Sequence, residues 1–179
     1  MHNIDPLNYV PEDAITKIRH PQRIVTLVHF VAHSVLESGG NHWVIFLETG
    51  QQYVRLEVVP GAYPRREGYL ARLDIIHNEY RLSRRHHNLV SIPAVTGHSV
   101  ADFLDAIIAA DNHRYEFTRE GRGCTGWVRD QLYLFVQMGL LPTGWESRIE
   151  TAMTLAWVEG ASQGPWPITK GRYLGRRKG

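Results

Sequence analysis

Residues 42–59, HWVIFLETGQQYVRLEVV, decide the fold class of this chain. Two β-rich segments, His42–Glu48 and Gln52–Val59, flank the short loop Thr49–Gln51. Segments of this composition around so short a loop favour an antiparallel hairpin. We therefore expect the two segments to pair as neighbouring strands of one sheet.

Further strand-like segments lie on both sides of this hairpin. Residues 23–34 and 69–76 are rich in β-branched and apolar residues, and 115–118 is a shorter candidate strand. Residues 89–95 have the same character, but Pro93 cannot donate to a ladder and restricts this strand to a sheet edge.

Apolar periodicity predicts helices in the second half of the chain, over residues 99–111, 124–138 and 145–159. Ser99 and Asp102 have the spacing of a helix cap and a weak capping box, a simpler role for Ser99 than that of a hydrolase nucleophile in Gly97–Ala101. A short helix near residues 12–18 is also expected. The fold class is thus α+β, a mainly antiparallel sheet with helices packed on it.

Composition restricts the function classes. The chain has 179 residues and a formal net charge of +2, which suits one α+β domain over residues 1–160, followed by a tail, 161–179, that is basic at its end. No basic face points to nucleic acid, and no apolar run has the length of a membrane span. We expect a cytoplasmic protein that acts on a small molecule, with the oligomeric state left open.

Cys124 is the only cysteine, so it cannot form an intramolecular disulfide. It follows a glycine-rich turn, Gly121–Gly123, at the expected start of a helix. Unpaired N–H groups and the helix dipole favour a thiolate there and offer donors to an oxyanion. Cys124 is therefore a candidate nucleophile, although burial as a small apolar side chain is the alternative.

A cysteine nucleophile needs a base and a group that orients the base. His42 opens the first strand of the hairpin, near the rim of the sheet. On the second strand Arg55 and Glu57 alternate onto one face with Tyr53, and the apolar residues take the other face. We expect His42 to be the base, with Glu57 or Arg55 orienting it; an ordinary partly buried histidine and a solvated polar face are the alternatives.

This order of residues resembles the circularly permuted papain-like proteins, in particular those similar to lecithin:retinol acyltransferase. His42–Trp43 matches their histidine strand, Arg55 is the nearest match to the polar residue on the next strand, and Gly123–Cys124 matches their cysteine helix. The chain departs from that family in having arginine where a second histidine is usual, and Gly-Cys-Thr in place of Asn-Cys. The resemblance implies a papain-like arrangement and acyl chemistry.

The chain also resembles a group of fungal proteins of unassigned function. Three motifs carry this resemblance over most of the chain: Asn41-His42-Trp43, Val54-Arg55-Leu56 and Gly123-Cys124-Thr125-Gly126-Trp127. This second resemblance implies no activity.

Two classes of function remain. The first is a cysteine-dependent hydrolase or acyltransferase acting on an amide, ester or thioester, with Trp43, Tyr53, Trp127 and Gly123 as substrate-binding residues. The second is a non-covalent binding protein, or a cyclase or isomerase of a biosynthetic pathway, that uses the same aromatic residues. No cofactor motif occurs, and His29 and His33 stand too far apart on a strand to share a metal.

Overall fold

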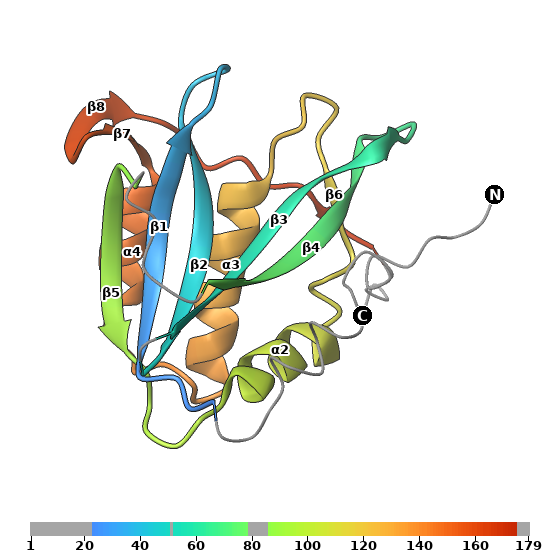
Figure 1. The fold of residues 1–179 in the computed structure, drawn as a ribbon. Helices are drawn as coiled ribbons and strands as arrows, with labels where there is room; N and C mark the ends of the chain where they lie inside the picture. The colour runs from blue at the N-terminus through green and yellow to red at the C-terminus, as the bar shows by residue number, and fades with distance from the viewer. Residues whose placement is uncertain (1–22, 51, 79–85, 175–179) are drawn as a thin grey trace.

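The computed structural model describes residues 23–50, 52–78 and 86–174 as an α+β fold (Figure 1). A seven-stranded, mainly antiparallel sheet has the order β5-β1-β2-β3-β4-β6-β9, which confirms the expected fold class. The strands of this sheet are β1 (Leu27–Val35), β2 (Asn41–Thr49), β3 (Gln52–Pro64), β4 (Tyr69–Asn78), β5 (Asn88–Pro93), β6 (Tyr115–Phe117) and β9 (Arg172–Tyr173).

The β2–β3 hairpin forms as the sequence predicts, and β5 lies at the sheet edge where Pro93 restricts it. Strand β3 continues to Pro64, beyond the expected end at Val59, because it pairs with β4 across an irregularity between Pro60 and Pro64. The expected helix near residues 12–18 and the basic end of the tail, residues 176–178, lie outside the described residues.

Three helices follow in the described part of the chain: α2 (Val100–Ala109), α3 (Cys124–Gln137) and α4 (Glu146–Met153). In Figure 1, α3 runs behind β2 and β3. Its buried face, which includes Trp127 and Phe135, packs against alternate residues of the sheet such as Ile45 and Leu56. We call this the helix face of the sheet, and the opposite side the outer face. No helix among the described residues is long and apolar enough to cross a membrane.

The C-terminal region differs from the expected helix and tail. Helix α4 ends at Met153, and a second hairpin follows, formed by β7 (Leu155–Val158) and β8 (Ala161–Pro165). Its two-residue turn, Glu159–Gly160, has φ of +48° and +79°, which suits the right-handed twist of the strands. Beyond it β9 pairs with β6 in the main sheet, so residues 161–173 belong to the fold.

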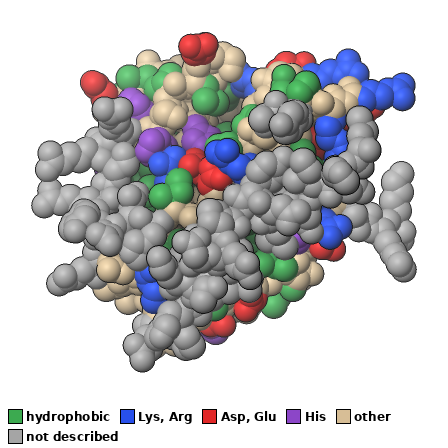
Figure 2. All heavy atoms as spheres, turned by 45° about the vertical axis from the view of Figure 1, so that its right-hand side comes forward, with side chains coloured by type: hydrophobic (Ala, Val, Ile, Leu, Met, Phe, Trp, Pro, Cys, Tyr) green, Lys and Arg blue, Asp and Glu red, His purple; other side chains and the backbone are tan. Residues whose placement is uncertain are grey.

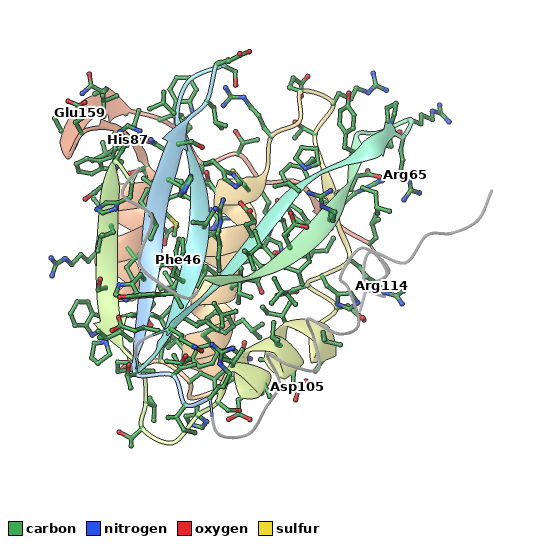
Figure 3. All side chains as sticks on the ribbon, in the orientation of Figure 1. Phe46, Arg65, His87, Asp105, Arg114 and Glu159 are labelled. Atoms are coloured by element: carbon green, nitrogen blue, oxygen red, sulfur yellow. The ribbon has the colours of Figure 1, made fainter. Side chains whose placement is uncertain are left out.

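The β7–β8 hairpin is attached to the start of β5. The Glu159 N–H donates to His87 Nδ1 at 3.0 Å, and the Gly160 N–H donates to the His87 carbonyl at 2.7 Å. His87 and Glu159 lie together at the upper left of Figure 3. These contacts fix the direction in which the chain leaves the hairpin toward Trp166.

The capping box at α2 allows a stability prediction. The Ser99 N–H donates to Asp102 Oδ2 at 2.9 Å, and Ser99 Oγ accepts from the Asp102 N–H at 3.4 Å. Ser99→Ala removes the second contact, and we expect it to lower the free energy of unfolding by about 1 kcal/mol in urea titrations. Ser99→Asp keeps an acceptor and should lose less. Equal stability of Ser99→Ala and the native protein would contradict the capping role.

Candidate active site

The candidate site lies where β2 and β3 separate. Their pairing runs from Thr49–Gln52 to Ile45–Leu56, while β2 extends back to Asn41 and β3 onward to Pro64. Figure 1 shows the two strands diverging, with α3 behind the opening. Because His42 and Glu57 lie beyond the last β2–β3 pair, their side chains have room between the strands.

Cys124 is the first residue of α3, at this opening. The N-cap, Gly123, has φ of +145°, a conformation that side-chain-bearing residues rarely adopt. The Tyr115 hydroxyl donates to the Gly123 carbonyl at 2.8 Å and so fixes the turn. The Cys124 side chain is consequently directed from the helix terminus toward β2, with the residue 7% exposed.

His42 connects the thiol to Glu57. His42 Nε2 lies 2.6 Å from Glu57 Oε2, and the His42 side chain is hydrogen bonded to Cys124. Because Nε2 faces Glu57, Nδ1 is the ring nitrogen left for the thiol. Arg55 Nη2 donates to the same Glu57 oxygen at 2.7 Å. The structure thus brings together all four residues that the sequence analysis named as catalytic.

The charges in this group favour a thiolate and an imidazolium. Burial alone would lower the pKa of His42, but its bonds to Cys124 and Glu57 outweigh burial and raise the pKa to about 9. Burial raises the pKa of Cys124, yet the His42 hydrogen bond and charge give it a net lowering. Burial also raises the pKa of Glu57, and His42 and Arg55 together lower it below its ordinary value.

Backbone groups add to this stabilisation. The Trp43 backbone is hydrogen bonded to Cys124 in a way that lowers the thiol's pKa, so its N–H donates to the sulfur. The β2–β3 ladder that would otherwise use this side of β2 ends at Ile45. Among the described residues, the N–H groups of Cys124 and Thr125 have no partner and are available to an oxyanion, whereas the Gly126 N–H donates to the Thr169 carbonyl at 3.2 Å.

A small pocket of about 30 Å³ lies at the start of α3 and has Cys124 among its lining residues. Three parts of the chain form it: the β1–β2 connection with the start of β2, the turn before α3 with the first residues of that helix, and the segment after β8. The lining residues are Leu36, Asn41, Gly121, Arg122, Gly123, Cys124, Thr125, Trp166, Pro167 and Thr169.

The aromatic residues expected to bind substrate lie on opposite faces of the sheet. Trp43 and Trp127 are buried on the helix face, where Trp127 Nε1 donates to the Asn112 carbonyl at 2.7 Å. Tyr53 lies on the outer face, 5.9 Å from the His29 ring. Of the expected substrate-binding residues, Gly123 lines the pocket beside Cys124.

Sequence reasoning missed Trp166 and His33. Trp166 was assigned to the tail, although an isolated tryptophan between two prolines was a usable signal. His33 lies beside the group: burial and the charges of Arg55 and His42 lower its pKa. Figure 2 shows histidine side chains next to acidic and basic ones on this face of the molecule. The bulge in β1 between Ala32 and Ser34, which the sequence does not show, determines where His33 lies.

His29 forms a separate cluster on the outer face. Its Nδ1 lies 2.6 Å from Ser91 Oγ, and its Nε2 lies 2.6 Å from Glu48 Oε2. Both ring nitrogens of His29 are therefore hydrogen bonded to residues of β5 and β2. In the described ranges no group of three His, Cys, Asp or Glu residues is placed to hold a metal ion.

The chain belongs to a family described as a domain of unknown function, DUF7770, whose model matches residues 28–174. The matched region begins in β1 and ends just after β9, so it includes His42, Glu57, Cys124 and Trp166. No curated protein and no solved structure matches the chain.

Proposed function

We propose that this protein is a cysteine-dependent hydrolase or acyltransferase acting on an amide, ester or thioester of a small molecule. One observation carries the proposal: His42 is hydrogen bonded on one side to Cys124 and on the other to Glu57, at the N-terminus of α3. A nucleophile, a base and an orienting carboxylate in this sequence are the parts that covalent acyl transfer requires.

In the proposed first step, the Cys124 thiolate attacks the carbonyl carbon of the substrate, forming a carbon–sulfur bond. The carbonyl electron pair moves onto oxygen, where the N–H groups of Cys124 and Thr125 stabilise the negative charge. Collapse of this intermediate breaks the bond to the leaving group, and the His42 imidazolium gives that group its proton. The products are a Cys124 thioester and neutral His42.

In the second step, neutral His42 takes a proton from water or from an acceptor hydroxyl, amine or thiol. The activated acceptor attacks the thioester, and the thiolate leaves as the second intermediate collapses. The imidazolium is thereby restored beside the thiolate. Water as acceptor gives hydrolysis, and another nucleophile gives acyl transfer.

Glu57 and Arg55 support His42 in this scheme. The carboxylate accepts a hydrogen bond from Nε2–H, which keeps Nδ1 directed at the thiol and stabilises the imidazolium. Arg55 balances the second negative charge, so two cations and two anions are present when His42 is protonated. This arrangement and the chain order of its parts support a circularly permuted papain-like enzyme.

Acylation of the protein tests the proposal. We expect a p-nitrophenyl or thioester acetyl donor to add one acetyl group to Cys124, detected by intact-protein and peptide mass spectrometry. Cys124→Ser, which keeps a side chain of similar size, should form no thioester. Tight binding of aromatic ligands without any adduct would instead favour the non-covalent class of function.

The reactivity of Cys124 toward iodoacetamide gives a second test. Because the environment of the thiol lowers its pKa, we expect alkylation to rise with pH at a midpoint below the free-thiol value of about 8.5. His42→Ala removes the hydrogen bond and the charge that lower this pKa, and should move the midpoint upward. A native midpoint at or above about 8.5 would contradict the proposed nucleophile.

A further inference from the structure

Trp166 lines the same small pocket as Cys124. It follows the β7–β8 hairpin, and its N–H donates to the Thr154 carbonyl at 2.7 Å. The indole lies on the turn at Gly39 and Gly40, where a Cβ would be 2.4 Å and 2.3 Å from ring atoms. Glycine at these two positions, with φ of +96° and +73°, therefore allows the ring to lie directly against the backbone.

Arg122 also contacts the Trp166 ring. Its guanidinium carbon lies 5.1 Å from the centroid of the Trp166 ring, within the range of a cation–π contact. Arg122 Nη2 also donates to the Ser38 carbonyl at 2.7 Å. The arginine thus links the turn before α3, the glycine turn and the tryptophan, and is already engaged by protein groups.

The pocket that Trp166 and Cys124 both line is small, and its lining includes both apolar and polar residues. Its volume of about 30 Å³ accommodates about one small group of a few heavy atoms. Leu36, Trp166 and Pro167 are the large apolar residues of its lining, which also includes Cys124. An acyl chain larger than this volume, attached to the sulfur within the pocket, needs space that the lining residues occupy.

We propose that Trp166 is a specificity-determining residue that restricts the Cys124 site to small, apolar acyl groups such as acetyl. The proposal rests on the proposed function, since it names the class of acyl group that the same site accepts. The restriction acts through volume, because the wall of the pocket is held in place by Gly39, Gly40 and Arg122.

Thiol labelling with a small and a bulky reagent tests the proposal without requiring turnover. We expect the native protein to react with iodoacetamide and only slowly with fluorescein-5-maleimide at Cys124. Trp166→Ala should raise the maleimide rate by more than about tenfold while changing the iodoacetamide rate by less than about threefold. Trp166→Phe, which retains an aromatic ring on the glycine turn, should give an intermediate ratio and serves if Trp166→Ala does not fold.

Trp145→Ala is the matched control. Trp145 also contacts an arginine, with the Arg148 guanidinium carbon 5.7 Å from its ring, but it does not line this pocket. Its two labelling rates should keep the native ratio. Equal acceleration of both reagents in Trp166→Ala, or no change in either, would overturn the role of Trp166.

A series of acyl thioesters from acetyl to octanoyl separates this proposal from the proposed function. We expect the native protein to prefer acetyl, and Trp166→Ala to raise kcat/KM for octanoyl relative to acetyl by about tenfold or more. If the native protein turns over none of these thioesters but shows the expected labelling ratios, the acyl-transfer function is overturned and the size restriction remains supported. Unchanged chain-length preference in an active Trp166→Ala enzyme would overturn the size restriction alone.

Discussion

Cys124→Ala is expected to abolish turnover of the acyl substrate, lowering kcat by at least about 10⁴-fold, because no other group in the site supplies a nucleophile. His42→Ala should lose a similar factor, since the imidazole keeps the thiol ionised and protonates the leaving group. The measurement is the steady-state rate of each variant with the acyl donor that labels the native protein.

The Cys124→Ala, His42→Ala double variant decides whether the two residues act as one unit. If they do, the double variant should be no slower than either single variant, because the first substitution already abolishes the contribution that the two residues make together. Cys124→Ser tests folding separately, since it changes little volume at a residue that already contacts the Thr125 hydroxyl at 3.9 Å. A Cys124→Ala protein that retains full activity would eliminate the covalent mechanism.

The sequence was sufficient to predict that Arg55 and Glu57 share one face of β3, because the alternation of side chains on a strand is local. A period of two places Tyr53, Arg55 and Glu57 on one face of β3, and the structure has them there, opposite Leu56. The hairpin loop then brings β2 beside β3, so His42 had to lie near this face. None of these steps depends on contacts between distant segments.

The sequence could not predict where the β2–β3 ladder ends. Ladder pairing stops at Ile45 and Leu56 although both strands remain β-rich beyond this point. The opening is filled by the start of α3, which lies about 80 residues later in the chain than His42. Whether a thiol and an imidazole meet there is determined by packing between distant segments and not by local propensity.

The C-terminal region shows the same limit. The segment after Met153 continues an apolar pattern that suits a helix, but the turn at Glu159 and Gly160 reverses the chain and allows β7 and β8 to pair. Trp166 then reaches the glycine turn that precedes β2. Its position depends on two turns that lie more than 100 residues apart, so no local sequence signal places it at the site.

Glu57→Ala is expected to have the largest effect on stability, lowering the free energy of unfolding by about 3 kcal/mol. The carboxylate is buried and bonded to two cationic partners, so its removal takes this counter-charge from Arg55 and leaves His42 with Cys124 as its remaining anionic partner. Glu57→Gln keeps an acceptor and should cost about 1 kcal/mol. Urea titrations at neutral pH measure both changes.

Glu48→Gln is the matched control for this prediction. Glu48 also accepts from a histidine at 2.6 Å, but that histidine, His29, bonds Ser91 and not a cysteine. Glu48→Gln should therefore leave the acylation kinetics unchanged even where it alters stability. A comparable loss of activity in Glu48→Gln and Glu57→Gln would show that the kinetic effect arises from the sheet as a whole.

The pH dependence of stability follows from the direction of each shift. The pKa of Glu57 is lowered from 4.5, so its contribution is complete above that value and is lost as the pH falls through the folded-state pKa. The pKa of His42 is raised from 6.5 to about 9, so its contribution is complete below 6.5 and is lost as the pH rises through about 9. The difference in the free energy of unfolding between the native protein and Glu57→Gln should therefore become smaller at acid pH and at alkaline pH.

The effect of Glu57 on His42 should be visible in the alkaline limb of the profile of kcat/KM against pH. We expect kcat/KM of the native enzyme to fall above about pH 9, where His42 loses the proton that it gives to the leaving group. Glu57→Gln removes one of the contacts that raise this pKa, so its alkaline limb should begin at lower pH, with a loss of about 10²-fold in kcat/KM. That loss is smaller than for Cys124→Ala because Glu57 holds His42 and forms no bond to the substrate. An alkaline limb that stays in place would show that Glu57 stabilises the fold without acting on His42.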